Sequence, residues 1–229
     1  MDGILLIDKP DGISSFGVVA KVRWILSQAA GKKVKIGHAG TLDPFATGLL
    51  ILLVGKATKQ ADQFLKLDKT YEATLQLGAT STTADPEGEL TTVSDRVPIQ
   101  AEIDEVLKKF IGTIQQTPPI FSAIKVNGQR AYKLARKGQE VVMQPRTVTI
   151  YDIADVKYDC PELSFSVKVS SGTYIRSLAV DIGEYLEVGA YLTALRRTNI
   201  AEYDIKDAVL TDGLSAEIVI KNLLAIDNI

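Results

Sequence analysis

The sequence of 229 residues contains one cysteine, Cys160, and one histidine, His38. These counts exclude intrachain disulfides, clustered cysteine and histidine zinc sites, iron–sulfur clusters and metal sites with paired histidines. Any Ser-His-Asp arrangement would have to use His38. Cys160 lies in a turn-like stretch next to a proline, and we interpret it as a free thiol without a function.

Long hydrophobic runs are also missing. The longest aliphatic run, residues 49–54, is far shorter than the roughly 20 residues that a membrane-spanning helix needs. The apolar run at residues 4–7 follows Asp2 and is interrupted by Asp8-Lys9-Pro10, so it lacks the basic start and the length of a secretory signal. We therefore expect no membrane partner and a cytoplasmic location.

The charges are sorted along the chain, although the net charge is only -2. Residues 21–40 hold basic residues and no acid, and residues 121–146 hold basic residues with Glu140 as the only acid. Residues 82–107 are acidic apart from Arg96. The pattern fits two interpretations: solvated faces of opposite sign, or a basic groove that suits a phosphate backbone.

Hydrophobic periodicity predicts an α+β fold, with several non-consecutive strand segments interleaved with helices. We expect strands at residues 2–8, 49–54, 71–77, 121–126 and 163–169. We expect helices at residues 14–30, 58–65, 101–111, 173–186 and 215–224, with loops at 36–48 and 79–97 and a tight turn at Asn127-Gly128. One domain of the size of a catalytic domain, residues 1–229, is the simplest division.

The densest cluster of unusual residues is the segment 37–48, which contains His38, three glycines and Asp43-Pro44. Glycines permit close backbone approach, and Pro44 favours an extended conformation for Asp43. Such a loop could present one carboxylate in a fixed direction. The structural alternative is an Asp-Pro turn, or an aspartate that caps the next helix.

A nucleophilic aspartate would need a partner that keeps it ionised, and an arginine could serve. The segment 171–178 offers Arg176 beside Tyr174, where a strand meets a helix, and such groups suit a flat, anionic ligand. By themselves, Arg176 could form a surface salt bridge and Tyr174 could be a core-edge tyrosine. Tyr71 could be only a strand residue, and Leu195 only a core residue.

Six segments of the chain resemble the successive motifs of the TruB family, the bacterial tRNA pseudouridine-55 synthases. They occur in the family's order between residues 3 and 198, and they read GILLIDKPDGISS, KIGHAGTLDPFATGLLILLVGKATK, KTYEATLQLGATSTTAD, TPPIFSAIKVNGQRAYKLARKG, SSGTYIRSLAVDIG and GAYLTALRRT. One of these motifs would be a weak signal. Six ordered motifs with compatible spacing are a strong one.

The resemblance implies the pseudouridine synthase fold, which has a mixed, mainly antiparallel sheet with flanking helices and a catalytic cleft. It also implies a role for each matching residue. It makes Asp43 the catalytic carboxylate, Arg176 its ion-pair partner, and Tyr71 a catalytic residue that also stacks on the flipped base. It assigns His38, Tyr174 and Leu195 to substrate binding, with His38 stacking within the RNA. Lys9-Pro10 matches an element that we expect to be architectural.

The resemblance also implies the reaction, which is isomerisation of uridine 55 in the tRNA T-loop to pseudouridine by base flipping. No metal or cofactor is expected, and the expected partner is the tRNA T-stem-loop, without guide RNA, for a monomeric enzyme. The family's C-terminal PUA-type domain is expected to be absent or truncated. The alternatives are the guide-dependent archaeal and eukaryotic branch, and a non-catalytic RNA-binding or RNA-folding module on the same scaffold.

Overall fold

The computed structural model describes residues 1–126 and 128–225, and the chain divides into two compact units. Unit 1 comprises residues 1–71 and 195–229, and unit 2 comprises residues 72–194. Strands β4 (Lys69–Leu77) and β12 (Ala190–Ile200) contain the two boundaries. Pairing is mainly antiparallel, which confirms the predicted α+β class. The prediction of one catalytic domain stays a prediction.

Unit 1 is organised around β3 (Thr47–Val54), whose residues 48–54 are all buried. β1 (Gly3–Lys9) pairs with it antiparallel along its whole length, from Gly3 opposite Val54 to Lys9 opposite Gly48. β2 (Ile36–Ala39) pairs antiparallel and β12 pairs parallel with the same strand. Short strands β14 (Val209–Leu210) and β13 (Tyr203–Asp204) extend the sheet from β1 and β12.

Apolar residues cover both faces of β3, which explains why its sequence is a continuous aliphatic run. One face packs with α1 (Ser15–Ala30) through Val18, Val22 and Leu26. The other face packs with Phe64 of α2 (Ala61–Leu65) and with Ile200. The 3₁₀ turns η1 (Gly55–Gln60) and η2 (Ile205–Asp207) and helix α6 (Ala216–Lys221) complete this unit.

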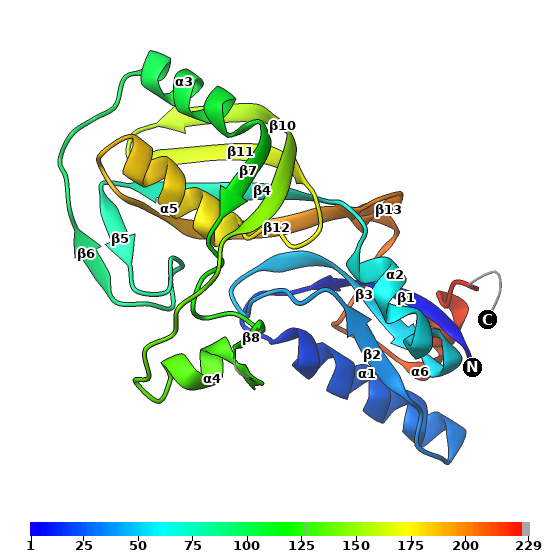
Figure 1. Ribbon diagram of the computed structural model, residues 1–229. Helices are drawn as coiled ribbons and strands as arrows, with labels where there is room; N and C mark the ends of the chain where they lie inside the picture. Colours follow the sequence, from blue (N-terminus) through cyan, green and yellow to red (C-terminus); the bar gives the residue numbers. More distant parts are fainter. Residues whose placement is uncertain (127, 226–229) are drawn as a thin grey trace. The chain divides into compact units, whose positions relative to one another are not determined.

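Unit 2 contains an antiparallel sheet in which β10 (Arg146–Asp159) pairs with β11 (Glu162–Val169) and β7 (Gly112–Gln116). The side chains of β11 alternate between buried and more exposed positions, so one face of the sheet is covered. Helix α3 (Gln100–Phe110) contacts β10, β7 and α5 (Ile175–Tyr185), and Figure 1 shows both helices beside this sheet. A short helix, α4 (Ala131–Ala135), follows the hairpin of β8 (Lys125–Val126) and β9 (Gln129–Arg130).

The structure corrects three of the sequence expectations. Residues 36–39 form β2 rather than a loop, because they pair with residues 51–54. Within residues 79–97, β5 (Ala79–Ser81) and β6 (Leu90–Thr92) form a hairpin rather than a plain loop. In the expected strand 121–126, only Lys125–Val126 is extended and paired. The expected Asn127-Gly128 turn lies partly outside the described residues.

Among the residues that the structure describes, no helix combines the length and the apolar character needed to cross a bilayer.

Candidate active site

Asp43 lies in the loop between β2 and β3, and its side chain is partly exposed. The N–H of Ala46 donates to the carbonyl oxygen of Asp43 over 3.2 Å, so the chain turns directly after the aspartate. The element that follows is a strand. The interpretation of Asp43 as the cap of a following helix is therefore wrong, and its carboxylate projects from a turn.

The two chain neighbours of Asp43 are held by buried polar side chains. The Ser15 hydroxyl accepts from the N–H of Leu42 over 2.8 Å and donates to its carbonyl over 2.9 Å. The Lys9 ammonium donates to the carbonyl of Pro44 over 3.0 Å, and Lys9 is fully buried. The loop is thus fixed on both sides of Asp43, which fits the architectural role expected of Lys9-Pro10.

Arg197 of β12 binds the backbone on both sides of the same loop, at Gly40 directly after β2 and at Leu49 near the start of β3. Its Nη2 donates to the carbonyl of Gly40 over 3.0 Å, and its Nε donates to the carbonyl of Leu49 over 2.7 Å. The side chain is buried. The sequence motifs contained this arginine, but nothing in its spacing pointed to a partner so distant in the chain.

Tyr71 of β4 is also buried, with 8% of its surface exposed. The guanidinium carbon of Arg197 lies 6.0 Å from the centre of the Tyr71 ring, within the range of a cation–π contact. Lys69, two residues earlier, donates to the carbonyls of Leu65 and Leu67. Burial, together with the charge of Arg197, lowers the pKa of Lys69 to about 8.

The other two site residues predicted in unit 1 differ in exposure. His38 lies on β2, opposite Leu52 of β3, and is partly exposed. Leu195 on β12 is buried, with 8% of its surface exposed. Both positions are compatible with the expected roles in substrate binding, and both roles stay predictions.

In unit 2, Arg176 forms a buried ion pair with Asp85, a residue that the sequence reasoning missed. The Nη1 of Arg176 lies 3.3 Å from Oδ2 of Asp85, and both side chains are 4% exposed. The guanidinium also donates to the carbonyls of Thr83 (3.1 Å) and Phe121 (2.8 Å). The interpretation of Arg176 as half of a surface salt bridge is therefore wrong. Asp85 lies within the quoted segment KTYEATLQLGATSTTAD, and that was the only signal for it in the sequence.

Tyr174 directly precedes α5, and Gln116 at the end of β7 fixes its backbone. The Gln116 side-chain oxygen accepts from the N–H of Tyr174 over 2.8 Å, and the side-chain nitrogen donates to the Tyr174 carbonyl over 3.1 Å. Gln116 is 1% exposed, while the Tyr174 side chain is partly exposed. The expected pairing of Arg176 with Asp43 stays a prediction, because the two residues belong to different units.

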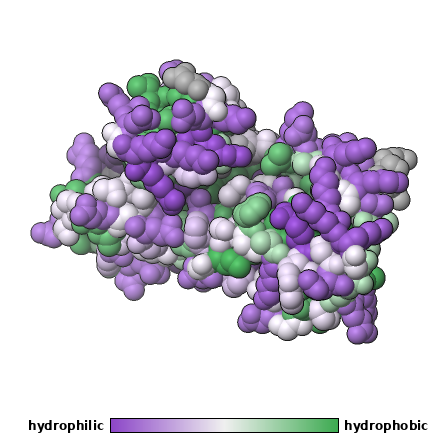
Figure 2. All heavy atoms as spheres, turned by 90° about the horizontal axis from the view of Figure 1, so that it is seen from below, coloured by the Kyte–Doolittle hydropathy of each residue, from purple (hydrophilic) through white to green (hydrophobic). Residues whose placement is uncertain are grey.

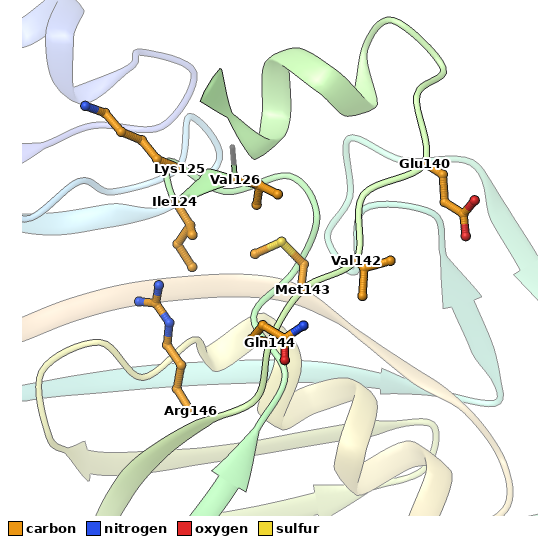
Figure 3. A pocket seen from close by; sticks show the side chains of 8 residues that line it. All are labelled: Ile124, Lys125, Val126, Glu140, Val142, Met143, Gln144 and Arg146. Atoms are coloured by element: carbon orange, nitrogen blue, oxygen red, sulfur yellow. The ribbon is translucent and has the colours of Figure 1, made fainter. Parts of the chain in front are cut away.

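A pocket of about 510 Å³ lies in the basic segment of unit 2. Figure 3 shows Ile124, Val126 and Met143 gathered around its centre, with Arg146 directed toward it and Lys125 extending away. The lining thus combines apolar side chains with two basic residues, Lys125 and Arg146. Glu140 also lines the pocket, so the lining carries charges of both signs.

Two family models match consecutive parts of the chain. One, described as TruB family pseudouridylate synthase (N terminal domain), matches residues 24–175. The other, described as tRNA pseudouridylate synthase B C-terminal domain, matches residues 176–224.

Curated relatives and solved structures resemble the chain over most of its length. Proteins named tRNA pseudouridine synthase B are 44% identical in Clostridium kluyveri, covering 99% of this chain and 77% of the relative, and 47% identical in Phocaeicola vulgatus, covering 92% and 90%. A chain in the crystal structure of a Cbf5-Nop10-Gar1 complex is 32% identical with a TM-score of 0.68. A chain in an H/ACA RNP bound to a substrate RNA containing 2'-deoxyuridine is 30% identical with a TM-score of 0.66. Each comparison covers 91% of this chain, which spans about half of those structures' chains (52% and 50%).

Proposed function

This chain belongs to the TruB family of pseudouridylate synthases, and we propose that it converts uridine 55 in the T-loop of tRNA to pseudouridine with Asp43 as the catalytic carboxylate. The names of its curated relatives support tRNA pseudouridylation as the general activity. The observation that carries the assignment of Asp43 is the fixed loop: a partly exposed carboxylate whose chain neighbours are both tied to buried side chains.

The reaction is an isomerisation, so nothing enters or leaves the substrate overall. The bond between N1 of uracil and C1′ of ribose breaks, the base turns, and a bond forms between C5 and C1′. The proton on C5 is lost, and N1 gains one. Asp43 could add to the sugar, add to the base or abstract a sugar proton, and each route needs an ionised carboxylate held in place.

The uridine lies inside a folded loop, so it must leave the base stack to reach Asp43. Unstacking a base costs a few kcal/mol, which new stacking contacts can offset. We assign these contacts to Tyr71 on the uracil and to His38 within the RNA. Tyr174 and Leu195 complete the proposed binding surface.

RNA contacts beyond the target loop are assigned to the two basic segments. Residues 21–40 contribute exposed lysines after α1, and residues 121–146 contribute the pocket of Figure 3. Phosphate contacts of this kind give affinity and register without reading the base. The choice of uridine would therefore depend on the loop around Asp43.

The test is a reaction of the purified chain with an unmodified tRNA transcript and no guide RNA, followed by nucleoside analysis and mapping of the modified position. We expect pseudouridine at position 55 and none in a transcript that carries cytidine there. Asp43→Asn should abolish the product and change RNA affinity by only a few-fold, because it removes the charge but nearly preserves the shape. Asp62→Asn, at an exposed carboxylate on α2, is the matched control and should behave as wild type.

Three outcomes would contradict parts of the proposal. Product at another position would overturn the assignment of uridine 55. Turnover by Asp43→Asn would overturn the role of Asp43. RNA binding without any product in the guide-free reaction would favour the guide-dependent branch or a non-catalytic module.

A further inference from the structure

Arg197 is one of the largest side chains that unit 1 buries completely, with 1% of its surface exposed. Its chain neighbour Arg196 differs, because the Arg196 side chain is 38% exposed and makes a two-pronged ion pair with Asp8. The hydrogen bonds that Arg197 donates within the described residues go to backbone carbonyls of Gly40 and Leu49. A buried charge that serves only to fill space is unfavourable, since an apolar side chain fills the same volume without the cost of desolvation.

Two glycines that flank the Asp43 loop lie against Arg197, Gly48 against its backbone and Gly40 within ordinary van der Waals distance of its guanidinium. Gly48 has a φ of +101°, and a Cβ added there would lie 2.3 Å from the backbone oxygen of Arg197. Gly40 has a φ of +97°, and its Cβ would lie 3.5 Å from Nη1 of the guanidinium. The chain therefore leaves β2 beside the Arg197 guanidinium and enters β3 against the Arg197 backbone, with which Gly48 is paired. Asp43 lies between the two contact points.

The same guanidinium faces the ring of Tyr71, at 6.0 Å from guanidinium carbon to ring centre. The charge of Arg197 also acts on Lys69, whose pKa is lowered to about 8, mainly by burial. Two buried cations thus lie close enough to repel each other, which is unfavourable. What this arrangement provides is a rigid link from the Tyr71 ring to both ends of the Asp43 loop.

We infer that Arg197 is a positioning residue that sets the Asp43 loop and the Tyr71 ring relative to each other. The inference rests on the proposed roles of Asp43 and Tyr71. Arg197 itself does not touch the reacting atoms in this role. A planar guanidinium can donate to two carbonyls in different directions and still present its face to a ring, whereas an ammonium is a point charge. Displacement of catalytic groups by about 1 Å can cost about 100-fold in rate.

The experiment compares Arg197→Met, Arg197→Lys and the control Arg196→Met in single-turnover reactions with saturating enzyme. Under these conditions the rate constant does not depend on what fraction of the enzyme is folded. We expect Arg197→Met to lower the rate constant about 100-fold, with RNA affinity within a few-fold of wild type. Arg197→Lys should recover part of the rate. Arg196→Met should leave the rate constant near wild type, with any effect confined to affinity.

A double-mutant cycle with Tyr71→Ala tests the link itself. If Arg197 acts through Tyr71, the double variant should be less impaired than the product of the two single effects. A wild-type rate constant in Arg197→Met would overturn the inference, as would strictly multiplicative effects in the cycle. The inference would also be overturned if Arg197→Met lowered only the reaction amplitude or the RNA affinity and left the rate constant unchanged. A wild-type chain that forms no pseudouridine would instead contradict the proposed function, so the two failures are distinguishable.

Discussion

The ion pair of Arg176 and Asp85 combines two charges that are almost completely removed from water. Asp85 is held in turn by the hydroxyl of Thr83 and by the N–H of Glu87. Such a pair contributes little net stability compared with apolar residues, but removing one partner leaves the other charge buried and uncompensated. The side-chain direction of Arg176 is therefore fixed inside unit 2, whatever else it contacts.

We expect Arg176→Lys to be severely impaired in turnover and also less stable than wild type. An ammonium cannot reproduce the contacts with Asp85, Thr83 and Phe121 in their separate directions. Asp85→Asn should lower the free energy of unfolding by about 3 kcal/mol, measured by denaturant titration. Asp95→Asn, at an exposed carboxylate of the same unit, is the control. Wild-type stability in Asp85→Asn would show that the ion pair is not needed.

The ring and the hydroxyl of Tyr71 can have different roles. The ring can stack on the flipped base, and the hydroxyl can take part in proton removal. Arg197 faces the Tyr71 ring, so a flipped base would have to contact the part of the ring that Arg197 does not cover. Stacking of a base on an aromatic ring is worth about 1 to 3 kcal/mol. Tyr71→Ala should therefore lose more RNA affinity and turnover than Tyr71→Phe. If Tyr71→Phe binds RNA but is inactive, the hydroxyl takes part in proton removal from C5. Tyr191→Phe, at an equally buried tyrosine, is the control, and full activity of Tyr71→Ala would remove Tyr71 from the site.

At this scale the sequence indicated residues that belong to recognisable motifs, and it missed those whose importance depends on burial. Asp43 and Tyr71 were identified from the segments that contain them. Arg197 was not, because its partner Gly40 lies 157 positions away and no periodicity links them. Asp85 was missed for a similar reason, since its significance comes from a contact with Arg176 on another element.

At the scale of elements, local sequence signals predict helix ends well, whereas strands that depend on long-range pairing are predicted poorly. Helix α1 begins and ends where the sequence suggested, because Ser14 caps it through the N–H of Gly17 and Gly31 closes it at a φ of +63°. The sequence predicts a loop where strand β2 lies, because its four residues, two of them with small side chains, show no alternation of apolar and polar residues. The pairing with β3 that makes it a strand is visible only in the fold.

The outward side of α1 carries two aromatic side chains that the core does not use. Phe16 is 63% exposed and Trp24 is 66% exposed, and they lie eight positions apart in one row of the helix. Arg23 places its guanidinium 5.5 Å from the ring centre of Phe16. Figure 2, the view from below, shows hydrophobic residues at several places among the hydrophilic ones on this face of the molecule. Exposed rings beside basic residues are typical of surfaces on which RNA bases stack.

If RNA lies along α1, replacing the Phe16 or Trp24 ring should weaken RNA binding. Loss of one stacked base costs about 1 to 3 kcal/mol, so Trp24→Ala should raise the Kd for tRNA about 5-fold or more. The thermal midpoint should stay within a degree or two of wild type, because the ring is exposed and surface changes have small effects. Phe16→Ala is the second test. Val97→Ala, at an exposed apolar residue in the acidic segment, is the control, and equal Kd values in all variants would exclude α1 from the RNA footprint.

At the scale of the whole molecule, the charge pattern matters more than its sum. A chain of net charge -2 gains no general attraction to a polyanion, so affinity must come from where its basic residues gather. Residues 21–40 contain no acid, and Lys33 and Lys35 within them are exposed. The acidic segment 82–107 would repel RNA, which restricts binding to the basic surfaces.

Salt dependence measures how many phosphates these surfaces neutralise. If about four phosphates are contacted, the slope of log K against log salt concentration should lie near -3 to -4. Lys33→Glu combined with Lys35→Glu should weaken binding to every RNA and flatten this slope, because fewer counterions are released. The position of the modified uridine should not change, since phosphate contacts carry no base information. Lys168→Glu, on an exposed position of β11 outside both basic segments, is the control. Salt-independent binding by the wild-type chain, or an unchanged slope in the double variant, would contradict an electrostatic footprint at residues 21–40.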